Sequence, residues 1–463
     1  MSPQRIVIGA DTYPPDVNGA ANFTHRLAVG LARRGHDVHV ICPDAPLAGP
    51  WRNRSGGPTV HGLASYRTPF HPTFRFCVPW RIRGAAARLL ERLKPDVIHV
   101  QSHFGVGRTL INLARRNGIP VMATNHFMPE NLLGYAPLPR RVADTASRLA
   151  WRDCVRVFSR ARIVTAPTPR AVRLLKDQGL GGIVLPVSCG LDLRRFAQPP
   201  AKPTEMGGRV LFVGRLDAEK NVDVLLRAVS LMPEDLPVTV ELVGDGSRRG
   251  ELAELARELG IEDRVAFRGF VDDTELLDAY ARCDVFCMPS IAELQSLATM
   301  EAMAAGKPVV AADAMALPHL VQPGRNGLLF PPGDAPALAA ALTAVLSDVP
   351  VRMRMGDASR EIVAQHDINA TLDIFELLYQ DARTGPRRAE DVSTASTASA
   401  VSTVSTVSAA AAVSGASAMS PVATAASAAS GEDRPEAVPG EGGAEAAPVE
   451  DSPETVLSGD RRE

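Results

Sequence analysis

The chain has 463 residues, of which 45% are hydrophobic and 22% charged, a composition that supports two or three globular domains. No apolar run approaches the roughly 20 residues that cross a bilayer, and MSPQRIVIGA does not match a secretory leader, so we expect a cytoplasmic protein. The six cysteines lack the paired spacing of a zinc site, which favours buried thiols in a reducing compartment over a disulfide framework.

The formal net charge of −2 hides two oppositely charged halves. Residues 1–195 contain 28 Lys/Arg against 11 Asp/Glu, and residues 196–463 contain 22 against 41, so the halves carry +17 and −19. A basic first half indicates an anionic partner, which can be nucleic acid, phospholipid headgroups or phosphorylated metabolites, with a solvated arginine-rich surface as the alternative. No nucleic-acid recognition motif or series of stacking aromatics accompanies the charge, so we expect no nucleic-acid partner.

Short runs rich in Val and Ile alternate with helix-like segments through residues 1–191. Such alternation is typical of a parallel sheet wrapped in helices, and it predicts an α/β domain. A stretch rich in Pro and Gly, residues 192–208, then interrupts the pattern, and we interpret it as a linker. The strands predicted before the linker are residues 5–10, 37–42, 96–100, 120–124 and 162–167.

The alternation resumes and continues through residues 209–385, which predicts a second α/β domain. Two doubly wound domains in tandem leave a cleft between them, and in such sheets ligands bind at the carboxyl ends of the strands. Residues 386–463 are rich in Ala, Ser, Thr and Glu and poor in large apolar side chains, so we expect a disordered tail. The strands predicted in the second domain are residues 209–214, 238–244, 264–270, 284–290 and 307–313.

Three glycine-containing loops follow predicted strands and offer anion sites. In GRLDAEKN, Gly214 ends a strand, and Arg215 and Lys220 flank a loop before a helix, a pairing of guanidinium and ammonium that suits a diphosphate. In LVGDGS, Gly244 ends the next strand before a Gly-rich turn. In PPDVNG, Gly19 closes a long loop whose backbone amides suit a phosphate. Solvated surface cations and ordinary tight turns are the alternatives.

Two glutamates, Glu293 and Glu301, lie eight positions apart beside a predicted helix that begins near Gln295 or Ser296 and ends at Gly306. Eight helical residues span roughly 12 Å and leave the two side chains within ~80° of one face. A carboxylate accepts hydrogen bonds from two hydroxyls, so the pair suits the two sugars of a sugar nucleotide. The alternative is that Glu293 caps the helix and Glu301 pairs with a neighbouring cation.

The order PS-x-x-E-x-x-S-x-x-x-x-E-A-M-A-x-G-x-P-V, together with GRLDAEKN, LVGDGS and PPDVNG, resembles the large retaining glycosyltransferase family with the GT-B fold. That family includes phosphatidylinositol mannosyltransferases, diacylglycerol glucosyltransferases and sucrose-phosphate synthases, and the resemblance covers roughly residues 5–380. It implies an N-terminal Rossmann-like domain on the acceptor side and a C-terminal Rossmann-like domain that binds the nucleotide sugar. It also implies that the last helix can cross back to the N-terminal domain.

The resemblance assigns roles to the matching residues. Arg215 and Lys220 would bind the donor diphosphate, Glu293 the transferred sugar and Glu301 the ribose. His126, in ATNHFMPEN after a predicted strand, would lie beside the reacting sugar and donate to the sugar or the phosphate. The predicted catalytic residues are therefore His126, Arg215, Lys220 and Glu293, and the predicted donor-binding residues are Gly19, Gly214, Arg215, Lys220, Gly244, Glu293, Gln295, Ser296, Leu297 and Glu301.

No DxD element is found, because Asp272 and Asp273 are adjacent and start a predicted helix. We therefore expect neither a metal ion nor a cofactor, with a nucleoside diphosphate sugar, GDP-mannose or UDP-glucose, as co-substrate. The mechanism that the resemblance implies is a retaining front-face substitution of a hexose, in which the departing phosphate oxygen takes the acceptor proton.

The acceptor prediction depends on the basic first half of the chain. Four arginines recur every four residues within the segment 147–162, and a second segment, 74–94, mixes arginines with aromatics. Each basic residue near an anionic bilayer contributes about 1 kcal/mol, so we expect a lipid acceptor, phosphatidylinositol (mannoside) or diacylglycerol, and peripheral attachment at the inner face of the plasma membrane. A solvated helix face, a soluble saccharide or small-molecule acceptor, and a non-catalytic sugar-nucleotide-binding scaffold are the alternatives. The four recurring arginines are Arg148, Arg152, Arg156 and Arg160.

Overall fold

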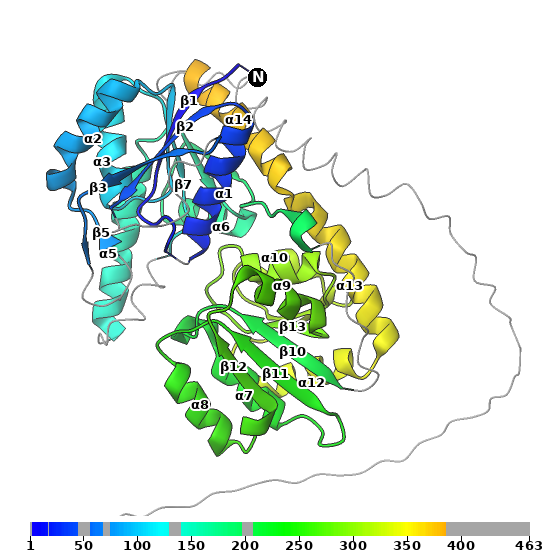
Figure 1. Ribbon diagram of the computed structural model, residues 1–463. Coiled ribbons are helices and arrows are strands. Elements are labelled where there is room, and N and C mark those ends of the chain that lie inside the picture. The colour runs from blue at the N-terminus through cyan, green and yellow to red at the C-terminus, as the bar shows by residue number, and fades with distance from the viewer. Residues whose placement is uncertain are drawn as a thin grey trace, which may run out of the picture. The chain divides into compact units, whose positions relative to one another are not determined.

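The computed structural model of the protein describes residues 2–16, 18–44, 56–67, 75–128, 140–196 and 207–385, and all of them belong to one compact unit (Figure 1). The predicted tail, residues 386–463, lies outside the described residues, as does most of the predicted linker. The division of the unit into two domains at residues 192–208 stays a prediction. The predicted α/β class with two parallel, helix-covered sheets is confirmed.

The first sheet has seven parallel strands in the order β3-β2-β1-β6-β7-β8-β9. A two-stranded antiparallel hairpin, β4 and β5, is separate from it. The elements are β1 Arg5–Gly9, α1 Gly19–Arg33, β2 Asp37–Pro43, β3 Thr59–Leu63, β4 Tyr66–Arg67, β5 Arg75–Phe76, α2 Pro79–Leu93, β6 Val97–Val100, α3 Gly105–Asn117, β7 Val121–Thr124, α5 Arg140–Phe158, β8 Ile163–Ala166, α6 Pro169–Asp177 and β9 Ile183–Pro186.

The second sheet has six parallel strands in the order β12-β11-β10-β13-β14-β15. Its elements, with the short 3-10 turns η1 to η4, are η1 Leu193–Phe196, β10 Gly208–Val213, η2 Ala218–Lys220, α7 Val222–Ser230, β11 Val238–Val243, α8 Arg249–Glu258, η3 Glu262–Arg264, β12 Val265–Gly269, α9 Asp273–Arg282, β13 Val285–Met288, α10 Leu297–Ala304, β14 Val309–Ala312, α11 Leu317–Leu320, β15 Gly327–Phe330, α12 Ala335–Leu346, α13 Val349–Val363, η4 Ala364–His366 and α14 Ile368–Thr384.

All ten strands predicted from the sequence are present, and no strand end differs from its predicted position by more than two residues. The strands that the sequence analysis missed in the two sheets are β3, β9 and β15, and each is an edge strand. The interior strand β13 buries every residue, whereas the edge strand β15 buries only its first and last. A half-buried run of four or five residues lacks the continuous apolar pattern that marks an interior parallel strand.

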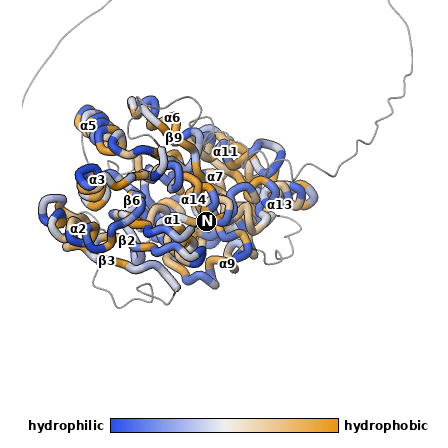
Figure 2. The backbone as a smooth tube through the Cα atoms, turned by 90° about the horizontal axis from the view of Figure 1, so that it is seen from above, coloured by the Kyte–Doolittle hydropathy of each residue, from blue (hydrophilic) through white to orange (hydrophobic). Residues whose placement is uncertain are grey.

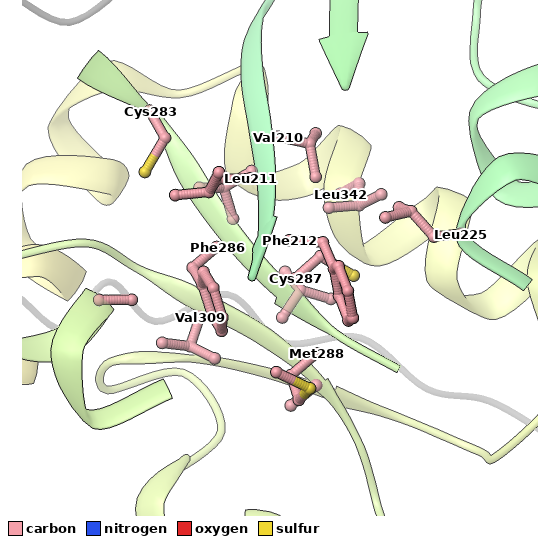
Figure 3. Close-up of a cluster of buried hydrophobic side chains, with 14 of the residues drawn as sticks. Val210, Leu211, Phe212, Leu225, Cys283, Phe286, Cys287, Met288, Val309 and Leu342 are labelled. Carbon is pink, nitrogen blue, oxygen red and sulfur yellow. The ribbon is translucent and has the colours of Figure 1, made fainter. Parts of the chain in front are cut away.

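Apolar side chains on both faces of each sheet form the cores. In the second sheet, Figure 3 shows Phe212 of β10 on the side of Leu225 from α7 and Leu342 from α12, with Leu211 on the opposite side of the strand. This alternation follows from the two-residue period of a strand. In Figure 2 the covering helices α2, α3 and α5 alternate between hydrophilic and hydrophobic segments, as helices with one buried side do.

Helix α14, the last described helix, packs against α1, β6 and β7 of the first sheet (Figure 1). Arg34, at the end of α1, donates to Glu376 Oε2 over 2.9 Å. The hydroxyl of Tyr379 lies 2.8 Å from Nδ1 of His99 on β6. Both Tyr379 and His99 are fully buried, so α14 forms part of the core of the first sheet and not a surface appendage.

Each sheet has one position where the strand order reverses direction, and there the loops after two neighbouring strands diverge. In the first sheet this position lies between β1 and β6, and in the second between β10 and β13. Ligands of doubly wound sheets bind outside the carboxyl ends of the strands at such positions. The loops that follow these four strands are therefore where a site is expected.

Among the described residues, no single helix combines the length and apolarity needed to cross a bilayer. Two consecutive helical segments, Ala335–Leu346 and Val349–His366, reach that length and apolarity only when taken together, and the angle between them is 99°.

The contact between α1 and α14 gives a stability prediction. Arg34→Ala removes the ion pairs to Asp373 and Glu376, and leaves the Glu376 carboxylate, 10% exposed, without that partner. We expect the free energy of unfolding to fall by about 2 kcal/mol in urea denaturation. Arg325→Ala is the matched control, since its pair with Glu361 is exposed, and we expect a loss below about 0.5 kcal/mol. Equal losses in the two variants would contradict this account of α14.

Candidate active site

Two loops at the carboxyl ends of β10 and β13 lie side by side in the second sheet. The first contains η2, and the second contains the PSIAELQS sequence before α10. The hydroxyl of Ser290 donates to the carbonyl oxygen of Glu219 over 3.2 Å, and the backbone N–H of Ile291 donates to the same oxygen over 3.1 Å. These bonds attach the second loop to η2, so the motif residues of both loops are held together.

Lys220 and Glu293 form an ion pair between the two loops. Their side chains are 16% and 11% exposed, so the pair is largely shielded from water. Burial by itself would raise the pKa of Glu293, but the Lys220 ammonium, the Ser290 hydroxyl and the Arg215 guanidinium together hold that pKa below its usual value. Glu293 is therefore ionised at neutral pH and accepts hydrogen bonds.

Arg215 is held by two carboxylates from its own loop. Its Nη1 lies 2.8 Å from Asp217 Oδ2, and its Nη2 lies 2.7 Å from Glu219 Oε1. Asp217 is itself fixed, because its Oδ1 accepts from the backbone N–H and the hydroxyl of Ser247 over 3.0 and 2.9 Å. The guanidinium is therefore oriented before any ligand binds, and 36% of the Arg215 side chain stays exposed.

The glycines of these loops permit a close approach between the ends of β10 and β11. A Cβ atom on Gly244 would lie 2.0 Å from the carbonyl oxygen of Gly214, and φ of Gly244 is +124°. A Cβ on Gly246 would lie 2.6 Å from backbone atoms of Leu216. Positions 244 and 246 therefore require glycine for packing of the loops. The close contact between Gly244 and Gly214 shapes the site whether or not either residue touches a ligand.

Helix α10 begins at Leu297, one or two residues after the predicted start, and ends at Ala304, two residues before the predicted end. Its cap is Ser296, whose side chain accepts from the backbone N–H of Thr299, so the alternative that Glu293 caps this helix is wrong. The side chain of Leu297 also contacts the first residue of α1, because its Cδ1 would lie 3.8 Å from a Cβ atom on Gly19. The structure thus brings the N-termini of α1 and α10 together, and with them the predicted residues Gly19, Ser296 and Leu297.

The Gln295 side chain connects the loop before α10 to the loop after β9. Its Oε1 accepts from the backbone N–H of Cys189 over 2.8 Å, and its Nε2 donates to the hydroxyl of Ser188 over 2.9 Å. Gln295 is 9% exposed, and both ends of its amide are occupied. Its observed contacts are with the protein, and its predicted role in donor binding stays a prediction.

Glu301 lies on α10 with a different set of neighbours from Glu293. Its Oε2 accepts from the hydroxyl of Tyr280 over 2.9 Å. Burial raises the pKa of Glu301, although the Tyr280 hydrogen bond and the guanidinium of Arg26 act in the opposite direction. Arg26 comes from α1, and its Nε and Nη2 are buried without a hydrogen-bond partner among the described residues. Arg26 of α1 and Glu301 of α10 therefore interact electrostatically, and this interaction links elements that pack on different sheets.

His126 follows β7 and is held by neighbours from three other segments. Its Nε2 lies 3.0 Å from Oε1 of Gln101, which follows β6, and its ring lies 4.9 Å from that of Phe23 on α1. An amide oxygen only accepts, so Nε2 carries the proton, and Nδ1 faces the Cys189 sulfur at 4.0 Å. Burial lowers the pKa of His126 to about 3, so the imidazole is neutral at neutral pH.

The four arginines that recur every four residues do not all lie on one helix. Arg148, Arg152 and Arg156 are exposed on α5. Arg160 lies two residues beyond the end of α5, and its Nη1 donates to Oδ1 of Asn112 over 2.5 Å. Burial and the nearby guanidinium groups of Arg115, Arg156 and Arg108 lower the pKa of Arg160, so these arginines form one crowded basic surface on α3 and α5.

The sequence analysis missed several residues that the structure places at the site. Asp217 and Glu219 lie inside the GRLDAEKN motif, where their spacing from Arg215 was a usable signal. Arg26 and Gln101 belong to no motif, and only the fold brings them to Glu301 and His126. Within the described ranges, no group of three or more His, Cys, Asp or Glu side chains has the arrangement of a metal site.

Comparison with known proteins gives consistent matches along the chain. Residues 195–362 match the family described as glycosyl transferases group 1, and residues 17–195 match glycosyltransferase family 4. A GDP-mannose-dependent alpha-mannosyltransferase of Mycolicibacterium smegmatis is 33% identical over 373 residues, which cover 78% of this chain and 92% of the relative. An alpha-monoglucosyldiacylglycerol synthase of Streptococcus pneumoniae is 26% identical, over 70% of this chain and 75% of the relative.

Among solved structures, sucrose-phosphate synthase of Thermosynechococcus elongatus superposes with a TM-score of 0.68. The sequences are 23% identical, and the match covers 81% of this chain and 99% of that chain. This likeness shows the fold, and the predicted GT-B fold is confirmed.

The buried pair gives a prediction that separates stability from activity. Lys220→Met leaves the Glu293 carboxylate without its counter-ion, so we expect a loss of about 2 kcal/mol in the free energy of unfolding at pH 7, and loss of glycosyl transfer. Because the pKa of Glu293 is lowered in the folded protein, the stability that the pair provides is present at neutral pH and is lost as pH falls through that pKa. The difference between the two proteins should therefore shrink at low pH.

The control is the double variant Lys220→Met/Glu293→Gln, which removes both charges. We expect it to regain most of the lost stability without regaining transfer, as measured by urea denaturation and by release of nucleoside diphosphate. A double variant as unstable as the single one, or a single variant as stable as the wild type, would contradict the role given to the pair.

Proposed function

The chain belongs to the group 1 glycosyltransferases of the GT-B fold, and we propose that it transfers mannose from GDP-mannose to a hydroxyl of a membrane lipid, with retention of configuration and without a metal ion. Its class as a glycosyltransferase that uses nucleotide sugars rests on the family match. The donor, the acceptor, the stereochemistry and the metal independence are the parts that we propose. The observation that carries the proposal is the arrangement of two cations and Glu293 in the two loops at the strand-order reversal of the second sheet.

The geometry of these loops suits a sugar diphosphate. Arg215 presents a fixed guanidinium, and Lys220 places an ammonium within hydrogen-bond reach of Glu293. In our proposal the diphosphate takes the Lys220 ammonium from Glu293, whose freed oxygen then accepts from the hydroxyls of the hexose. The name of the M. smegmatis relative favours GDP-mannose over UDP-glucose, the other donor considered.

The proposed chemistry depends on charge stabilisation at the leaving group. The two cations would stabilise the negative charge that develops on the departing diphosphate, which is the task that a metal ion performs in other transferases. A phosphate oxygen of the leaving group would take the acceptor proton on the face from which the group departs. Because its pKa is lowered to about 3, His126 would stay neutral and position the sugar instead of protonating it.

Two surfaces of the first half support a membrane acceptor. Near the start of α2, Trp80 is 80% exposed, and Tyr66 and Phe76 form an exposed ring pair with centroids 5.8 Å apart. The Arg81 guanidinium lies over the Tyr66 ring at 5.7 Å and donates to its hydroxyl over 2.7 Å. Aromatic side chains beside arginines are typical of proteins that sit at the polar boundary of a bilayer. The basic surface on α3 and α5 adds attraction to anionic headgroups.

The lipid acceptor also agrees with the name of the S. pneumoniae relative. A peripheral position at the inner face of the plasma membrane follows from it as part of the proposal. A soluble acceptor is the second candidate. It would be favoured if the exposed rings of Trp80, Tyr66 and Phe76 contacted another protein instead of a bilayer. A non-catalytic scaffold is disfavoured, because Arg215, Lys220 and Glu293 are present in one oriented cluster.

A donor panel tests the reaction. We expect the purified protein to release nucleoside diphosphate from GDP-mannose at least tenfold faster than from UDP-glucose, since the proposal assigns the donor site to mannose. We expect α-linked product by NMR and unchanged rates in EDTA, because Arg215 and Lys220 supply the positive charge. A β-linked product would overturn retention, and full inactivation by EDTA with rescue by Mg²⁺ would overturn metal independence.

Vesicle binding tests the proposed attachment of the protein to a membrane. We expect tighter binding to vesicles that contain phosphatidylglycerol than to vesicles of phosphatidylcholine alone, and weakening by salt, because screened charge carries the attraction. Arg148→Glu/Arg152→Glu/Arg156→Glu should reduce this binding while release of GDP in the absence of lipid stays unchanged. The matched control is Arg257→Glu on α8, which is exposed and belongs to the other sheet. Equal binding to both vesicles would favour a soluble acceptor.

A further inference from the structure

Arg26 of α1 is a partly buried arginine, and two atoms of its guanidinium group have no hydrogen bond in the described part of the chain. They are Nε and Nη2, and both are shielded from water. A buried polar atom without a hydrogen bond lowers the stability of a fold, and the loss is larger when the group is charged. An arginine that served only the fold would have partners for these atoms, so its position indicates another role.

Arg26 lies on the side of α1 that contacts α10. Gly19 and Arg26 are seven residues apart, about two helical turns, and therefore lie on the same side of α1. Leu297 contacts α1 at Gly19, and it packs against the apolar cluster that contains Phe23. Glu301 lies about one turn beyond Leu297 on the same side of α10. Helical side chains lean toward the N-terminus of their helix, so Arg26 leans toward the end of α1 that α10 contacts.

Arg26 and Glu301 act on each other as opposite charges. Burial has the largest effect on both groups, since it raises the pKa of Glu301 and lowers that of Arg26, and the charge of each partner acts against this effect. Arg195 acts on Glu301 as well, but it is paired over 3.1 Å with Asp273, whose charge has the opposite effect on Glu301. Arg26 is therefore the main cation that favours the charged form of Glu301.

The Glu301 carboxylate has one oxygen bound to the protein and remains accessible to a ligand. Its Oε2 accepts from the Tyr280 hydroxyl over 2.9 Å, and Glu301 is partly exposed. An ionised carboxylate accepts from two hydroxyls at once, whereas a protonated carboxyl group has one oxygen that carries a proton. Binding of the neighbouring hydroxyls of a ribose therefore depends on the charge of Glu301.

We propose that Arg26 is a positioning residue of the donor site: from α1, it holds the Glu301 carboxylate as a charged acceptor for the two ribose hydroxyls of the nucleotide sugar. The inference rests on the proposed function and on the predicted ribose role of Glu301, and it adds a residue that lies in none of the sequence motifs. Arg26 acts through Glu301 and contacts no part of the donor. Because Gly19 at the start of the same helix is predicted to lie over the phosphates, α1 would serve both the diphosphate and the ribose.

Nucleotides with and without the ribose hydroxyls test this role without requiring turnover. Calorimetry on the full chain compares GDP with 2′,3′-dideoxy-GDP, and we expect the wild type to bind GDP at least tenfold more tightly. Glu301→Gln and Arg26→Met should bind GDP about tenfold more weakly than the wild type and bind the dideoxy nucleotide equally well. Arg26→Lys keeps the charge and should recover most of the preference for GDP. Equal affinity of the wild type for the two nucleotides, or an unchanged preference in Arg26→Met, would overturn the inference.

The melting temperature separates this role from a structural one. Arg26→Met keeps apolar volume and removes buried nitrogen atoms that lack hydrogen bonds, so we expect an equal or higher melting temperature together with weaker GDP binding. Arg33→Met is the matched control, because Arg33 is exposed on the same helix, and it should change neither quantity. A clearly lower melting temperature in Arg26→Met, or its failure to fold, would assign Arg26 to the fold and contradict the inference.

The pH dependence of GDP binding gives an independent readout. The groups that act on Glu301 are Tyr280, Arg26, Arg195 and Asp273. Without Arg26 the pKa of Glu301 rises further, and the carboxylate is lost as pH falls through that pKa. The fall in GDP affinity on acidification should therefore begin at a higher pH in Arg26→Met than in the wild type, and 2′,3′-dideoxy-GDP should show no such difference. The same acidic decline in both proteins would count against the role of Arg26.

The choice of base distinguishes this inference from the proposed function. A wild type that binds UDP and not GDP would contradict the proposed donor, and the comparison of UDP with 2′,3′-dideoxy-UDP would then test Arg26 in the same way. A wild type that binds GDP, with Arg26→Met unchanged, would leave the proposed function in place and overturn the inference. Binding of neither nucleotide would contradict both.

Discussion

The ion pair between Lys220 and Glu293 joins the two loops on which the proposed donor site depends. Strands β10 and β13 are neighbours in the sheet, but the loops that follow them diverge at the strand-order reversal, so a connection between the loops helps to fix the separation of the motif residues. The pair provides that connection, and the bonds from Ser290 and Ile291 to the Glu219 carbonyl reinforce it. A largely buried pair of this kind adds little net stability, since desolvation offsets the attraction, but losing one partner is costly. Its value lies in holding an ammonium and a carboxylate ready for a ligand that carries both phosphate and hydroxyls.

The two sheets contribute different chemistry to the proposed reaction. The loops after β10 and β13 present charged groups, whereas those after β6 and β7 present neutral imidazoles, an amide and aromatic rings. The charged groups after β10 and β13 agree with a charged donor. Gln295 connects the loop before α10 to the loop after β9, and Arg26 places a guanidinium from α1 near Glu301. Residues from both sheets therefore surround the groups assigned to the donor.

Sequence patterns predicted the fold and the motif residues because both depend on local signals. Interior strands such as β13 are continuous apolar runs, and Arg215, Lys220 and Glu293 lie in motifs with fixed spacing. Edge strands were missed because half-buried runs lack that pattern. The ion pairing of the motif residues with one another was also missed, since Lys220 and Glu293 are far apart along the chain. Gln101, His103 and Arg26 each have a buried polar atom without a partner among the described residues. No sequence pattern encodes this feature, because it depends on the folded protein.

The most direct test of the central claim is a crystal structure of the protein with GDP-2-deoxy-2-fluoromannose, a donor analogue that resists transfer. The account predicts diphosphate oxygens within about 3.2 Å of Arg215 and Lys220, and a hexose hydroxyl at hydrogen-bond distance from Glu293, with the Lys220 ammonium moved from the carboxylate to phosphate. A bound donor whose diphosphate contacts neither cation, while the Lys220–Glu293 pair stays as it is, would contradict the account.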